Sequence, residues 1–149
     1  MYKTILVPLD GSKRAEAILP HVEDVARSTG AAIVFLQVVE PPKITGYEGF
    51  DPGLYQNELE ELTRQAKSYM DSQEDKFRKK GFDCRSRTDH GAIVRSILNA
   101  ADAEKADLIA MASHGRGGLA RVFYGSVAAG VLQRIDRPLL LIRAAFEDE

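Results

Sequence analysis

The stretch that decides the fold runs from residue 111 to residue 127 and reads MASHGRGGLARVFYGSV. An apolar run, residues 108–112, stops here in a loop that carries three glycines. Gly125-Ser126 then opens a second apolar pattern with helical spacing. A glycine-rich loop between a strand and a helix presents several backbone N–H groups to one point, and with the helix N-terminus these groups bind phosphate. The stretch therefore predicts a nucleotide-binding α/β domain.

The bulk properties narrow the class of protein. A chain of 149 residues favours one domain spanning residues 1–149. The formal net charge of −2 argues against a general nucleic-acid surface, which depends on clustered Lys and Arg. The pair Lys13-Arg14 is short and is interpreted as solvated. No run of 18 apolar residues is present, so no membrane span is expected, and the single cysteine, Cys84, fits a reducing, cytoplasmic compartment.

Apolar runs and helical patterns alternate along the chain. The order is β-α-β-α-β-α-β-α-β, which predicts a single-domain α/β fold with a doubly wound, five-stranded parallel sheet and helices on both faces, Rossmann-like, in the strand order 3-2-1-4-5. Expected strands cover residues 3–9, 31–39, 82–88, 107–112 and 138–143, and expected helices cover residues 15–27, 54–80, 91–103 and 125–135.

Three local signals refine these elements. Ser12 is placed to cap the first helix and Gly30 to end it. Pro20 lies inside the helical pattern, where it is expected either to kink the helix or to cost it one hydrogen bond. The loop at residues 41–53 is long enough to be a lid, a disordered segment or a partner-contacting segment. The long helix that follows carries an apolar stripe predicted to be core: Leu59, Leu62, Ala66, Tyr69, Met70 and Phe77.

Two polar features should meet at one place in such a sheet. Ligands bind beyond the carboxyl ends of parallel strands, where the strand order reverses. With the first and fourth strands as neighbours, the loop carrying Asp10 and the loop carrying Gly115 lie at the same crevice. This convergence is a stronger indication of a binding site than either loop alone.

The motif Ala112-Ser113-His114-Gly115, nine residues, then Gly125-Ser126, closely resembles the nucleotide signature of the universal stress protein family. That signature is Gly, two residues, Gly, nine residues, Gly, then Ser or Thr. The segments ILVPLDGS (residues 5–12), QVVE (37–40) and RPLLLIR (137–143) also resemble the family, so the resemblance covers essentially the whole chain.

By analogy with the family's ATP-binding branch, the resemblance implies an ATP site. Residues 8–10, Val38 and residues 111–112 would surround the adenosine, and the loop from Gly115 to the start of the last helix would approach the phosphates. Glycine lets a backbone come close to a phosphate, and a serine at a helix start lies at the positive end of the helix dipole. The predicted nucleotide-binding residues are Pro8, Leu9, Asp10, Val38, Met111, Ala112, His114, Gly115, Arg116, Gly125, Ser126 and Val127.

Several alternatives stay open at this point. Ala112 stands where the signature has its first glycine, so it is strained if that position needs a positive φ and harmless if it needs only a small residue. Asp10 could simply cap a turn, Gly125-Ser126 could be only a helix start, and His114 could serve a structural hydrogen bond. No catalytic residue and no protein-only metal site are predicted.

Three functions are compatible with the sequence, and they differ in whether the protein binds and hydrolyses ATP. The first is a stress-response regulatory module that binds ATP, with Mg²⁺ on the phosphates, and signals to an unknown partner. The second is an ATPase, which would be slow because the loop lacks the GK[ST] ending of a P-loop. The third is an interaction protein with an empty site. The resemblance also implies a homodimer, and an apolar last strand at a sheet edge supports pairing through Leu139, Leu140, Leu141 and Ile142.

Overall fold

The computed structural model describes residues 1–43, 49–113 and 125–144 of the chain. Its centre is a parallel sheet of five strands in the order β3-β2-β1-β4-β5, which confirms the predicted order. The expected strands are all present, with bounds that differ by one or two residues. They are β1 (Thr4–Pro8), β2 (Ala32–Val39), β3 (Cys84–His90), β4 (Leu108–Ser113) and β5 (Leu139–Arg143).

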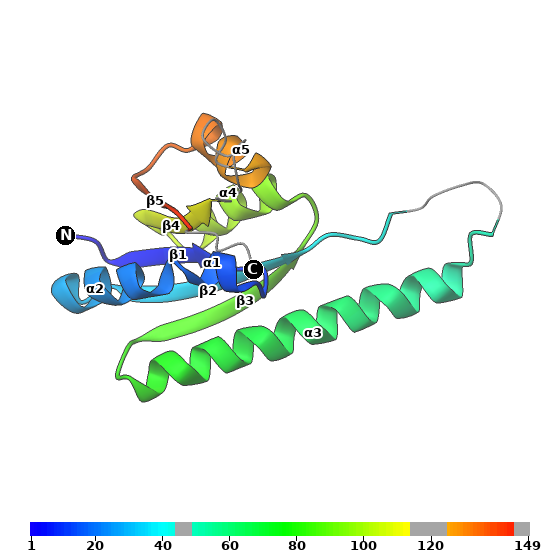
Figure 1. Cartoon of the computed structure of the whole chain (residues 1–149), viewed down its shortest axis with the longest axis horizontal. Helices are drawn as coiled ribbons and strands as arrows, with labels where there is room; N and C mark the ends of the chain where they lie inside the picture. The colour runs from blue at the N-terminus through cyan, green and yellow to red at the C-terminus, as the bar shows by residue number, and fades with distance from the viewer. Residues whose placement is uncertain (44–48, 114–124, 145–149) are drawn as a thin grey trace.

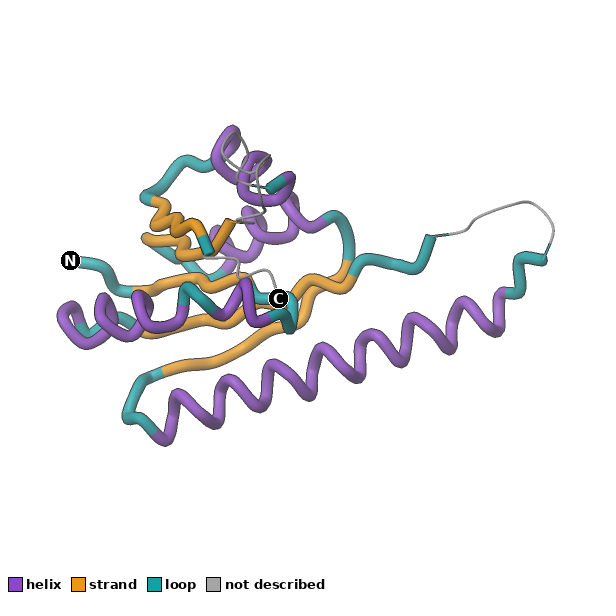
Figure 2. The backbone as a smooth tube through the Cα atoms, viewed as in Figure 1, coloured by secondary structure: helices purple, strands orange, loops and turns teal. Residues whose placement is uncertain are grey.

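Helices cover both faces of this sheet, as Figures 1 and 2 show. The first face carries α1 (Lys13–Glu16), α2 (Leu19–Thr29) and α3 (Pro52–Lys79), and the second carries α4 (Ile93–Ala103) and α5 (Ser126–Arg134). Because both faces are buried, the central strands are apolar at consecutive positions rather than at alternate ones. In β1, Ile5 and Val7 pack towards α2 and α3, whereas Leu6 packs towards α4 and α5.

The helical pattern that follows β1 forms two helices instead of one kinked helix. The N–H of Ala15 donates to Ser12 Oγ at 3.1 Å, so Ser12 caps α1 as predicted. Pro20 lies in the first turn of α2, where a residue has no helical partner for its N–H and the fixed φ of proline is compatible with the helix. The chain therefore breaks before Pro20, and Gly30 ends α2 with a φ of 76°, as expected of a helix C-cap.

The long helix α3 is only partly a core element. Asp51 caps it by accepting from the N–H groups of Gly53 and Leu54, so the helix begins slightly earlier than predicted. Its C-terminal half buries Ala66, Met70 and Phe77 against the sheet. The N-terminal half extends beyond the sheet (Figure 1), and the expectation that the whole stripe is core is wrong for Leu62, whose exposure is 36%.

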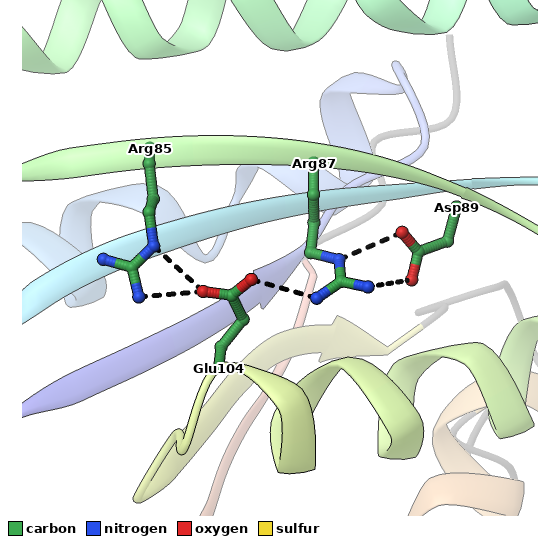
Figure 3. A network of polar contacts seen from close by, with 4 residues as sticks. All are labelled: Arg85, Arg87, Asp89 and Glu104. Carbon is green, nitrogen blue, oxygen red and sulfur yellow. Dashed lines mark hydrogen bonds and ion pairs between the residues drawn. The ribbon is translucent and has the colours of Figure 1, made fainter.

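The edge strand β3 is stabilised by charged side chains. Glu104, which follows α4, accepts from Arg85 Nε and from Arg87 Nη1, both at 2.9 Å, and Arg87 also donates two bonds to Asp89 at 3.0 Å (Figure 3). The polar pattern of this strand therefore belongs to a sheet edge, as predicted. None of the helices in the described part of the chain is both long enough and apolar enough to cross a membrane.

A candidate nucleotide pocket

The neighbouring strands β1 and β4 separate at their carboxyl ends. β1 pairs with β2 along its whole length, from Thr4 to Pro8. It pairs with β4 only at Ile5 and Leu6, although β4 continues to Ser113. The strand order reverses between β1 and β4, so this opening is the place where parallel sheets bind ligands.

A pocket occupies this opening and brings together distant parts of the chain. The structure encloses about 100 Å³ there, which is less than the roughly 300 Å³ or more of most ligand pockets. A nucleotide would therefore extend out of the enclosed part. Seven of the residues predicted from the sequence line the pocket: Pro8, Leu9, Asp10, Val38, Met111, Ala112 and Val127.

Asp10 forms the turn after β1 and also lines the pocket. Its Oδ1 accepts from the N–H of Ser12 at 2.9 Å and from the Ser12 hydroxyl at 2.6 Å. Gly11, between them, has a φ of 88°, a conformation that favours glycine. The turn-capping alternative for Asp10 is therefore part of the structure, and it fixes the carboxylate at the mouth of the pocket.

Arg14 is a pocket residue that the sequence interpretation missed. The Lys13-Arg14 pair was expected to be solvated, and Lys13 is indeed exposed. Arg14, in contrast, lines the pocket, and its Nε atom is buried. The one-turn helix α1 turns this side chain inward while it carries Lys13 outward. The signal available in the sequence was its position, two residues after the cap Ser12 in the segment that follows the first strand.

Ala112 fits the site without strain. It lies in β4, paired with Ile142 of β5, and it lines the pocket. Among the described residues, Lys105 is the only non-glycine residue with a positive φ. The alternative in which alanine is strained at this signature position is therefore excluded, and Ala112 contributes a small side chain to the pocket wall.

The start of α5 lies beside the same pocket. Gly125 precedes the helix with a φ of 84°, which favours glycine, and Ser126 is exposed at the first helical position. Val127 reaches the pocket wall. The remaining predicted residues, His114, Gly115 and Arg116, lie outside the described residues.

The apolar floor of the pocket comes from elements that the motif did not include. Leu36 of β2 and Ala128 of α5 contribute, together with Ile93 and Ile97 of α4. Both isoleucines belong to the inward stripe of a helix that the sequence had already predicted, and the strand order brings them beneath the opening. The described residues contain no cluster of His, Cys, Asp or Glu that could hold a metal ion.

Comparison with known proteins fixes the family. The model of the universal stress protein family matches residues 1–143. The chain belongs to that family. Universal stress protein MJ0577 of Methanocaldococcus jannaschii is 29% identical over 155 residues, which cover 96% of each chain. Its solved structure has a TM-score of 0.81 and 28% identity, with 99% of both chains covered.

Two further universal stress proteins share the fold and were solved with nucleotides. One, in complex with cAMP, has a TM-score of 0.65 and 23% identity, covering 97% of this chain and 98% of the other. The other, from Arabidopsis thaliana with AMP bound, has a TM-score of 0.66 and 16% identity, covering 96% and 92%. At these identities the likeness establishes the fold.

Proposed function

We propose that this universal stress protein is an ATP-binding regulatory module that takes the nucleotide in the opening between β1 and β4. The observation that carries the proposal is the pocket itself, where residues after β1, at the end of β4 and at the start of α5 line one cavity. The cAMP and AMP complexes of proteins with the same fold support an adenine nucleotide as the ligand class.

The chemistry of the lining suits adenosine in the floor and phosphates at the mouth. Apolar side chains such as Ile97 and Met111 provide surface for the base, and the Asp10 carboxylate can accept from a ribose hydroxyl or from the amino group of the base. The N–H groups at the start of α5 and the Arg14 guanidinium supply positive charge for phosphate oxygens. Mg²⁺ would be held mainly by the phosphates.

The alternative of a slow ATPase differs from the module in one respect. Hydrolysis requires a positioned water, a metal and charges that stabilise the transition state. The described residues offer Arg14 and the N-terminus of α5, and the glycine-rich loop has no P-loop lysine. Turnover would therefore be slow. The third alternative, an interaction protein with an empty pocket, predicts no retained nucleotide.

The decisive experiment measures the nucleotide that co-purifies with the chain, then titrates the stripped protein with ATP and adenosine, and finally follows phosphate release. Gly125→Ala should weaken ATP binding at least tenfold, because alanine is strained at the positive φ of this position, beside the expected phosphates. Adenosine has no phosphate, so its binding should be nearly unchanged. Gly30→Ala is the matched control, since Gly30 also has a positive φ but lies at the far end of α2. Failure of the wild-type chain to bind any adenine nucleotide would contradict the proposal.

We also propose that the functional unit is a homodimer formed through β5. This strand pairs with β4 alone among the described strands, and its four apolar residues, 139–142, are each only half-buried. An apolar edge with unpaired backbone groups favours pairing with a second copy. Sedimentation of the purified chain at micromolar concentration tests this directly.

A further inference from the structure

Helix α1, which forms one wall of the pocket and packs Ala15 against the core, is too short to hold its own position. It is a single turn of four residues, and none of them is buried. Isolated turns of this length are not stable on their own, because helix nucleation is unfavourable. Its position must therefore be set by contacts with neighbouring elements.

A polar contact with α3 supplies one such anchor. Glu16, the last residue of α1, accepts a hydrogen bond of 2.5 Å from the Tyr69 hydroxyl through its Oε2. Gln73 Nε2 approaches the same oxygen at 3.4 Å. Tyr69 is half-buried and Gln73 is buried, so both donors reach Glu16 from the part of α3 that packs on the sheet. Of the two contacts, the bond from Tyr69 is the short one.

The surroundings of Tyr69 keep its hydroxyl a donor. Burial raises the pKa of this phenol, and the hydrogen bond and negative charge of Glu16 raise it further, as does the charge of Asp10. A phenol in these surroundings stays protonated throughout the physiological range. Tyr69 and Asp10 also line one shared depression on the surface beside α3, so the phenol lies on the same side of the molecule as the pocket carboxylate.

A short chain of contacts connects this bond to the pocket. The N–H of Glu16 donates to the Ser12 carbonyl at 3.2 Å, and the N–H of Ala15 donates to the Ser12 hydroxyl, which in turn donates to Asp10. Ser12, Arg14 and Ala15 all line the pocket. A displacement of Glu16 would therefore move the wall that carries Arg14 and the carboxylate of Asp10.

We infer that Tyr69 is a positioning residue of the nucleotide pocket, which holds the α1 wall in its binding conformation by donating to Glu16. The inference rests on the proposed function and links the position of α3, through Glu16, to the wall of the site. A change in the position of α3 would reach the pocket through the contacts that Tyr69 and Gln73 make with Glu16, of which the Tyr69 bond is the shorter.

The test compares two phenylalanine substitutions on the same helix. Tyr69→Phe should weaken ATP binding about tenfold, whereas Tyr55→Phe, at the end of α3 remote from α1, should leave it unchanged. In the absence of nucleotide, the amides of Ala15 and Glu16 should exchange with solvent faster in Tyr69→Phe and at the wild-type rate in Tyr55→Phe. The exchange measurement keeps this inference separate from the proposed function, because it needs no ligand.

A double-mutant comparison establishes that Tyr69 acts through Glu16. Glu16→Ala should weaken ATP binding to a similar extent, and adding Tyr69→Phe to it should produce no further loss. Additive losses, or exchange rates at Ala15 and Glu16 that match the wild type in Tyr69→Phe, would overturn the inference. A wild-type chain that fails to bind ATP would remove the proposed function, and the exchange data would still decide whether Tyr69 holds α1.

Discussion

The two edges of the sheet are built from opposite kinds of side chain. At one edge, β5 carries Leu139 to Ile142, which are half-buried and alternate between the two cores. At the other edge, β3 carries three charged side chains (Figure 3). Arg85 and Arg87 both form ion pairs with Glu104, and Arg87 also pairs with Asp89. Charged residues on an edge strand oppose pairing with another chain, and apolar ones favour it. The comparison predicts that the chain associates with a second copy through the β5 edge and not through the β3 edge.

The largest effect is expected from blocking the β5 edge. The N–H of Ala144 and the carbonyl of Pro138 point towards β4, so the N–H groups of the odd-numbered residues between them point away from the sheet. Leu141→Pro removes one such outward donor and should convert the proposed dimer into a monomer. Sedimentation equilibrium should report half the wild-type mass, while circular dichroism stays close to wild type.

The control for this variant is Leu140→Pro on the same strand. Its N–H points inward to β4, so the substitution breaks a ladder bond inside the sheet. It should destabilise the fold by about 3 kcal/mol, which is the cost of a proline that removes a hydrogen bond inside a helix. A Leu141→Pro chain that remains dimeric would place the dimer contact elsewhere.

The next effect tests the charged edge through its shared carboxylate. Glu104→Gln removes the charge that both arginines contact and should lower the free energy of unfolding by about 1 kcal/mol. For a chain of this length that corresponds to a fall in Tm of about 2–4 °C. Glu61→Gln breaks an exposed pair with Arg64 and should leave Tm unchanged. An equal fall in both variants would contradict a special role for Glu104.

The same carboxylate gives a pH dependence with a definite sign. Burial acts to raise the pKa of Glu104, but the hydrogen bonds from Arg85 and Arg87 outweigh it and lower the pKa below its usual value of 4.5. The unfolded chain therefore takes up this proton first as the pH falls below 4.5, so the contribution of Glu104 to stability is complete above that value and is lost at lower pH. Urea titrations should show the gap between wild type and Glu104→Gln shrinking from pH 6 to pH 3.

The smallest effect is expected from making the two edges alike. Arg85→Val combined with Arg87→Val replaces the charges on β3 by β-branched apolar side chains. The variant should form assemblies larger than the wild type at concentrations of about 0.1 mM, because a second edge is then free to pair. Light scattering measures this. A variant with the wild-type mass would mean that α3, which packs against β3, already protects this edge.

The fold was predictable because its signals are local and agree with one another. Continuous apolar runs, Gly30 after a helical pattern and the polar alternation of β3 each predicted one element. Right-handed crossovers, together with two halves that wind in opposite directions from β1, account for the observed strand order. Pro20 was harder to interpret, since one proline is compatible with either a kink or a new start. In the structure a new helix starts just before Pro20, and the spacing of apolar residues did not reveal this break.

The candidate site was only partly predictable because a motif names residues, whereas a pocket is made of surfaces. Asp10 and Ala112 follow from the loops and the signature, but Arg14 lines the pocket because one turn of helix orients it. The length of the α3 stripe was equally misleading. Periodicity shows which face of a helix is apolar, and it does not show where the sheet beneath that face ends, as Leu62 illustrates.

The order of the strands also determines which apolar surface of the nascent chain is exposed while the protein is being synthesised. β1 is central, yet β4, its neighbour on one side, is made about a hundred residues later. While the first three strands can already assemble, one side of β1 stays open until Ser113 has emerged. The newly made chain therefore carries a temporary apolar edge in the middle of its future sheet, and chaperone contacts on the nascent protein should concentrate there.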